Sequence, residues 1–186
     1  IRNNALYLNK FICLNLNKFE IGRPYVNWLE SYSLYNSMDP WFAKNISEDW
    51  VPCKNRVMAI LQDESALKEM VQLVGEDALS APDRLKMEVA RSVREDLLQQ
   101  NAFMEEDTYT SLHKQFMLMK LILTFYDICL EALDKGANIN KLIAMEVREP
   151  IGRFKYTAED KVDDRFKEIE AALAKEADDV VQEVDF

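Results

Sequence analysis

After residue 50, apolar residues recur along most of the chain at steps of three and four positions, which is the spacing of one helix face. The first such stretch predicts a helix that begins after the SEDW sequence ending at Trp50, with Pro52 tolerated in its first turn. Gly75 is expected to close this helix, because glycine accepts the backbone conformation that commonly ends one. The predicted apolar stripe consists of Val57, Ile60, Leu61, Leu67, Met70, Val71 and Val74.

A second helix has a clear start a few residues later. Ser80 can cap it, Pro82 fits its first turn, and Asp83 lies three residues after the cap. Its apolar residues recur at strict four-residue steps, at Leu85, Val89, Val93 and Leu97. Because only about five residues separate the two helices, we predict an antiparallel helical hairpin.

The third helix is predicted to be the longest, from about Thr108 to Lys135, with Gly136 stopping it. Its main stripe consists of Leu112, Phe116, Met119, Leu123, Tyr126, Leu130 and Leu133. Apolar residues also lie off this stripe, which predicts a central helix that is buried on several sides.

Two more helices are predicted in the last third of the chain. A short one covers about 139–147 and is ended by Pro150, and the last follows Thr157, which has capping-box spacing to Asp160. The stripe of the last helix is Val162, Phe166, Ile169 and Leu173. After about residue 177 the sequence becomes acidic, and we expect this tail to fray.

The part before residue 50 has no such periodicity. Residues 1–22 are expected to be extended or irregular, and residues 23–35 are aromatic and expected to be half-buried. The sequence at 36–42 predicts a turn, because the residue before Pro40 is disfavoured in a helix. With only 4 glycines and 5 prolines, the whole predicts an all-α bundle with a protruding helical hairpin and an irregular N-terminal segment.

Charge and composition exclude several functions. The net charge of -10 disfavours nucleic acid as a partner. The 3 cysteines are far apart and there is 1 histidine, so we expect no metal site and a reduced, intracellular setting. The longest apolar run, 116–126, contains Lys120 and is too short to span a membrane.

No constellation for catalysis is present. The chain has neither a phosphate-binding loop nor a metalloprotease or nucleophile-elbow motif. Glu105 and Glu106 are expected to be solvated, and His113 lacks the partners of a catalytic or metal-binding histidine. We therefore predict no catalytic residue.

Several separate stretches, in order and over about 23–156, resemble the carboxyl-terminal part of the catalytic A subunit of archaeal-type and vacuolar-type rotary ATPases. They are NWLESYSLY, ILQDESALKEMVQLVGEDALSAPDRLKMEVARSVREDLLQQNAF, DTYTSLHKQFMLMKLILTFY and PIGRFKY. The resemblance identifies residues 23–186 as that helical domain, and residues 1–22 do not match the family. Because the chain begins without Met, we expect a piece of a longer protein.

The resemblance implies a ring of A and B subunits around a rotating coiled-coil shaft, peripheral to the membrane on the cytoplasmic side. ATP or ADP with Mg²⁺ would bind in the nucleotide-binding domain of the same subunit, and ATP hydrolysis or synthesis would be coupled to proton or sodium transport. Partners would be the B subunits, the shaft and that domain, with no direct membrane insertion. Without a P-loop, this chain should be inactive alone and hold no nucleotide tightly.

Two sites follow from the resemblance. Phe103, with Ala102 beside it, matches the family's phenylalanine that lines the adenine pocket, and an aromatic ring can cover the flat face of a base. From the residues alone, burial of Phe103 at the end of the second helix is favoured instead.

The hairpin tip matches the family's loop that presses on the shaft. The expected contact residues are Glu76, Asp77, Leu79, Ala81, Pro82 and Asp83. We expect a steric lever in which Leu79 and the stiff Ala81–Pro82 pair form the contact, and two packed helices transmit displacement. The alternative is a non-catalytic acidic module that binds a basic coiled coil. An exposed Phe103 would favour the ATPase interpretation, and a central, buried one the module.

Overall fold

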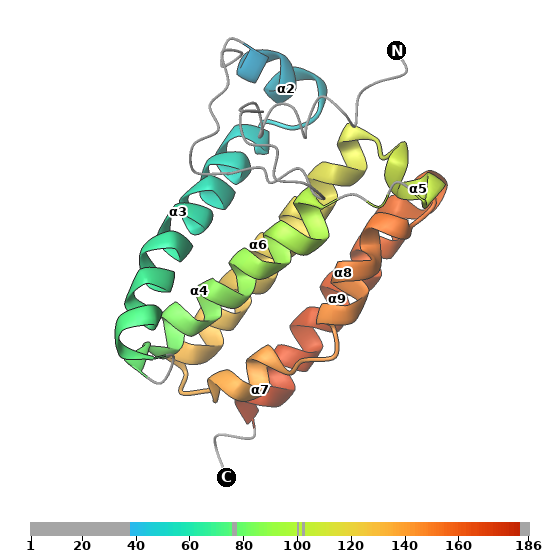
Figure 1. The fold of residues 1–186 in the computed structure, drawn as a ribbon. Helices are drawn as coiled ribbons and strands as arrows, with labels where there is room; N and C mark the ends of the chain where they lie inside the picture. Colours follow the sequence, from blue (N-terminus) through green and yellow to red (C-terminus); the bar gives the residue numbers. More distant parts are fainter. Residues whose placement is uncertain (1–37, 76–77, 100, 102, 183–186) are drawn as a thin grey trace.

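The computed structural model describes residues 38–75, 78–99, 101 and 103–182. Every regular element in this part of the chain is a helix (Figure 1). In chain order, the α-helices are α2 (Asp39–Asn45), α3 (Trp50–Val74), α4 (Ala81–Ser92), α5 (Glu105–Thr108), α6 (Leu112–Asp134), α7 (Ile139–Ile143), α8 (Arg148–Arg153) and α9 (Val162–Gln182). A π-helix (Val93–Leu98) continues α4, and 3₁₀ turns occur at Phe154–Tyr156 and Glu159–Lys161. The predicted all-α bundle is therefore confirmed for these residues, while the predictions for 1–22 and 23–35 lie outside them.

Helix α6 forms the centre of the bundle. It packs against α3, α4 and α9, and 12 of its 23 residues are buried. This confirms the prediction that the third helix is central and buried on several sides, but it is not the longest, because α3 has 25 residues and α6 has 23. It begins at Leu112 and not at Thr108, because the Ser111 hydroxyl accepts the Lys114 N–H at 3.1 Å and caps it. The short helix α5 occupies the preceding residues.

The helical hairpin is formed by α3 and α4, which pack against each other (Figure 1). Gly75 ends α3 with a φ of 87°, a conformation that suits glycine. The Ser80 hydroxyl accepts the Asp83 N–H at 3.3 Å, so α4 begins where the capping pattern predicts. On α4 and the π-helix, the buried members of the predicted stripe are Leu85, Val89 and Val93.

Both predictions that used proline as a helix breaker are wrong. Helix α2 begins at Asp39, with Pro40 in its first turn, where the sequence predicted a turn. Pro150 lies in the first turn of α8, and the predicted helix over 139–147 ends at Ile143. The physical reason is shared, because the first N–H groups of a helix have no intrahelical partner and proline loses nothing there.

The start and the end of the last helix also differ from prediction. Thr157 and Asp160 do not form the predicted capping box, because a 3₁₀ turn after Ala158, without a side-chain cap, leads into α9. The helix continues to Gln182, so fraying after residue 177 is wrong for the described residues. Ala177 is buried and Val180 packs against the core, which holds this end of α9 in place. The buried stripe is the predicted one, Val162, Phe166, Ile169 and Leu173.

Candidate functional site

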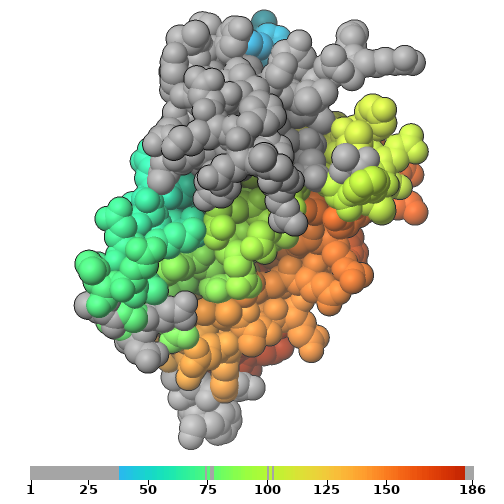
Figure 2. Space-filling view, viewed as in Figure 1, coloured from blue at the N-terminus to red at the C-terminus, as the bar shows by residue number. Residues whose placement is uncertain are grey.

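The two candidate sites lie at opposite ends of the bundle. The segment around α5 forms one edge of the molecule, and the turn between α3 and α4 lies at the other end of the long axis (Figures 1 and 2). Helix α4 with its π-helical continuation spans the distance between them. The arrangement thus places the predicted adenine-contact residue and the predicted hairpin tip at the two ends of one continuous helical segment.

Phe103 lies in the loop between the π-helix and α5, and its side chain is 98% exposed. Burial in the core, which the residues alone favoured, is therefore wrong. The π-helix ends at Leu98, whose side chain is buried, and the chain leaves the core before it reaches Phe103. Met104 and Tyr109 are also exposed, so three apolar side chains lie on the surface within seven residues. Ala102 lies outside the described residues.

The backbone around Phe103 is held by a set of hydrogen bonds. The Phe103 N–H donates to Asn101 Oδ1 at 3.0 Å, and the Met104 N–H donates to the Asn101 carbonyl at 3.2 Å. The Asn101 N–H in turn donates to Asp107 Oδ2 at 2.6 Å. Asp107 belongs to α5 and is only 3% exposed. These hydrogen bonds connect the backbone of Asn101 and Phe103 to the Asp107 side chain, while the Phe103 side chain is exposed.

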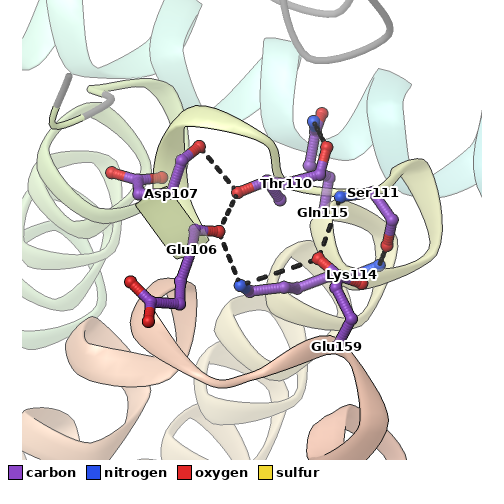
Figure 3. A network of polar contacts seen from close by, with 7 residues as sticks. All are labelled: Glu106, Asp107, Thr110, Ser111, Lys114, Gln115 and Glu159. Atoms are coloured by element: carbon purple, nitrogen blue, oxygen red, sulfur yellow. Dashed lines mark hydrogen bonds and ion pairs between the residues drawn. The ribbon is translucent and has the colours of Figure 1, made fainter. Parts of the chain in front are cut away.

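A polar network joins α5 to the central helix (Figure 3). The Lys114 ammonium, 1% exposed, donates to the Glu106 carbonyl at 2.9 Å and lies 3.8 Å from the Glu159 carboxylate. The Thr110 hydroxyl lies 3.0 Å from the same carbonyl and 2.8 Å from that of Asp107. Burial lowers the pKa of Lys114, while the carboxylate of Glu159 opposes this shift.

The PIGRFKY sequence holds the other side of the loop. The Lys155 ammonium donates to the carbonyls of Glu95 and Gln99, at 2.9 and 3.2 Å, at the end of the π-helix. These are carbonyls of the type that a helix end leaves without an intrahelical partner. A Cβ at Gly152 would lie 3.0 Å from Asp96 Oδ1, so a side chain there would push against the Asp96 carboxylate. Burial raises the pKa of Asp96, with Lys155 opposing.

The hairpin tip differs from the expectation in one respect. Leu79 is only 8% exposed, so little of its side chain is available on the surface for the predicted contact. An apolar residue directly before a helix cap commonly folds back onto the helix, and Leu79 precedes the Ser80 cap. Pro82 is exposed, while Ala81 and Asp83 are half-buried.

The remaining predicted tip residues, Glu76 and Asp77, lie outside the described part of the chain. The exposed apolar side chains near the tip belong to α3. Leu73 is 84% exposed, and Met70, one turn earlier, is about half exposed although the sequence placed it on the apolar stripe. Leu73 lies off the predicted stripe, which is the signal that identifies it in the sequence. The Arg84 guanidinium donates to Asn140 Oδ1 at 2.9 Å and fixes the start of α4 to α7.

The titratable side chains that the sequence analysis considered do not converge. His113 Nε2 lies 2.8 Å from Asp163 Oδ1, with both side chains more than half exposed. Glu105 and Glu106 are exposed on α5. Within the described ranges, no helix combines the length and the apolar character that crossing a membrane requires.

Comparisons with known proteins bear on the family of this chain. Residues 39–143 match the family of the C-terminal domain of V and A type ATP synthase. The V-type ATP synthase alpha chain of Acetivibrio thermocellus is 51% identical over 159 residues, which are 85% of this chain and 27% of the relative. That of Clostridium novyi is 48% identical over 162 residues, 86% of this chain and 27% of the relative. The chain thus spans about a quarter of the length of the curated relatives it matches, and it belongs to the family of C-terminal domains of V- and A-type ATP synthases, in the form found in their alpha chains.

Proposed function

We propose that this domain couples nucleotide contact in an ATP synthase alpha chain to the movement of a central shaft. In the intact subunit, ATP or ADP with Mg²⁺ binds in a separate nucleotide-binding domain, and Phe103 completes the adenine pocket. The partners are that domain, the neighbouring B subunits of the ring, and the shaft. The assembly couples ATP hydrolysis or synthesis to ion transport from the cytoplasmic side of a membrane.

The observation that carries this proposal is the exposure of Phe103. A phenylalanine that is 98% exposed on a loop with a hydrogen-bonded backbone is poorly explained by the stability of the domain alone. A planar, solvent-facing ring is suited to cover the face of an adenine base. The alternative interpretation, a module that binds only a coiled coil, does not explain why this phenylalanine is exposed.

The hairpin supports the second half of the proposal. Besides the apolar contacts between α3 and α4, Lys86 forms an ion pair with Asp63 at 2.7 Å, and Arg94 one with Glu64 at 2.8 Å. Packed interiors deform little, so a push at one end of the pair reaches the other. Coupling of this kind is reciprocal in binding free energy, and nucleotide contact therefore biases the position of the tip as much as the tip biases nucleotide contact.

We assign the contact with the shaft to Leu73 and not to Leu79. Leu73 and Met70 present apolar surface at the tip end of α3, and Pro82 adds an exposed ring on the start of α4. Because Leu79 is buried, its part is to fix the turn from inside.

The adenine assignment is tested by Phe103→Ala in the intact alpha chain within its assembled enzyme. Loss of one base–aromatic stack, about 1–3 kcal/mol, should raise the KM for MgATP about 5- to 150-fold. Tyr109→Ala is the matched control, because Tyr109 is another exposed aromatic residue six positions away. An unchanged KM in Phe103→Ala, or an equal rise in both variants, would refute the assignment.

A further inference from the structure

We propose that Asp107 is a positioning residue for Phe103 and acts through Asn101; this inference rests on the proposed function of Phe103. The carboxylate accepts the Asn101 N–H at 2.6 Å, and the Asn101 side chain accepts the Phe103 N–H at 3.0 Å. Two hydrogen bonds in series thus connect a buried side chain of α5 to the backbone of the exposed aromatic residue. We call this the Asp107–Asn101 clasp.

The need for a clasp follows from the exposure of Phe103. Packing contacts hardly restrict the position of a side chain that is 98% exposed. The position of Phe103 therefore depends on the backbone that carries it. If the loop takes other conformations, the apparent affinity for a ligand falls in proportion to the fraction that remains competent to bind. By holding the backbone of Asn101 and Phe103 in the conformation that binds, these hydrogen bonds increase nucleotide affinity without a direct contact from Asp107.

The clasp has the properties of a strong anchor. Hydrogen bonds to an ionised carboxylate are shorter than neutral ones and roughly twice as strong. Asp107 is 3% exposed, which keeps water from competing for its oxygens. Its own backbone is fixed in turn, because the Thr110 hydroxyl lies 2.8 Å from the Asp107 carbonyl.

Helix α5, which carries Asp107, is connected to the central helix α6. Lys114 of α6 donates to the carbonyl of Glu106, the residue before Asp107 (Figure 3). Helix α5 has only four residues and lacks the length to be stable by itself. The network of Figure 3 therefore fixes α5, and the hydrogen bonds of the clasp connect α5 to the backbone of Phe103.

Asp107→Ala in the intact alpha chain of the assembled enzyme tests the inference. Loss of a hydrogen bond to a charged group should lower the competent fraction of the loop and raise the KM for MgATP about three- to tenfold. The value of kcat should change less than about twofold, because no group that contacts the nucleotide is removed. Glu105→Ala, which removes an exposed carboxylate from the same helix, should leave both constants unchanged.

Two further variants separate positioning from folding. Asp107→Asn keeps an oxygen that can accept the Asn101 N–H, so its KM should lie closer to wild type than that of Asp107→Ala. Asn101→Ala leaves Asp107 in place and breaks only the second hydrogen bond, and it too should raise the KM. Helix content and melting temperature, measured for each variant, identify any that fails to fold.

The outcomes distinguish this inference from the proposed function. If Phe103→Ala leaves the KM unchanged, the adenine assignment is wrong and the inference falls with it. If Phe103→Ala raises the KM while folded Asp107→Ala and Asn101→Ala do not, the inference alone is overturned. If it holds, Asp107→Ala should add less than about a twofold rise when Phe103 is already alanine, because coupled residues are not additive.

Discussion

Replacing Lys114 by methionine should destabilise the chain by only about 1–2 kcal/mol, although the lysine is almost completely buried. Methionine matches the length of the aliphatic stem and removes the ammonium. The main loss is the hydrogen bond from Nζ to the Glu106 carbonyl at 2.9 Å. Hydrogen bonds of charged groups contribute about 1.5–3 kcal/mol.

Two features keep the loss below the usual cost of breaking a buried ion pair, about 3–5 kcal/mol. Burial disfavours the charged form of Lys114 and so lowers its pKa. Methionine carries no charge, so its burial does not have this cost. The groups left behind also keep partners. The Glu159 side chain is 48% exposed and remains hydrated, and the Glu106 carbonyl lies 3.0 Å from the Thr110 hydroxyl, whose one hydrogen it shares with the Asp107 carbonyl.

The assay is equilibrium urea unfolding of the 186-residue chain at neutral pH, followed by far-ultraviolet circular dichroism. Lys167→Met is the matched control, because Lys167 is exposed on α9 and its loss should change the free energy of unfolding by less than about 0.5 kcal/mol. A loss of about 4 kcal/mol or more for Lys114→Met would refute the reasoning, since it would mean that a group left behind is buried without compensation.

Two other predictions concern leucines at the hairpin tip and a buried thiol. Leu73→Cys in the alpha chain should cross-link to the shaft subunit of the assembled enzyme and Leu79→Cys should not, because only Leu73 is exposed; equal yields would contradict this. Burial raises the pKa of the Cys129 thiol from 9.0 to about 12, so the unfolded chain loses this proton at a lower pH than the folded chain. The linked stability is full below pH 9.0 and is lost as the pH rises toward 12, with about 1.4 kcal/mol lost by pH 10. In urea unfolding between pH 8 and 10, Cys129→Ala should lose about that much less than wild type; equal losses would exclude this linkage.

The sequence predicted the helices well where local chemistry decides their ends. Gly75 and the Ser80 cap mark the two sides of the hairpin turn as expected, because their effects depend only on adjacent backbone groups. The proline rule failed at Pro40 and Pro150 for a related reason. Proline breaks a helix interior but suits a first turn, and its position relative to the helix start is not visible when no strong cap precedes it.

The candidate sites were harder to predict because exposure is a tertiary property. Leu79 and Leu73 are both leucines near a turn; the off-stripe position of Leu73 is a weak signal, and the packing of α3 and α4 shows that Leu79 is buried and Leu73 exposed. The same holds for Lys114 and Asp107, whose sequence surroundings are polar. Lys114 lies near Glu159 and Asp107 accepts from Asn101, and no helical period encodes these contacts.

The proposed coupling places different demands on the parts of the path from Phe103 to the hairpin tip. The ion pair between Lys86 and Asp63 is partly exposed and adds little stiffness. The rigidity of the hairpin therefore comes from the partly buried Arg94–Glu64 ion pair and from the apolar core, where Leu85 is fully buried. The π-helix is different, because its last carbonyls rely on Lys155, a side chain supplied from beyond α8. Since π-helical turns often mark functional sites, the Lys155 contact is the part of the proposed path that depends on hydrogen bonds and not on the apolar core.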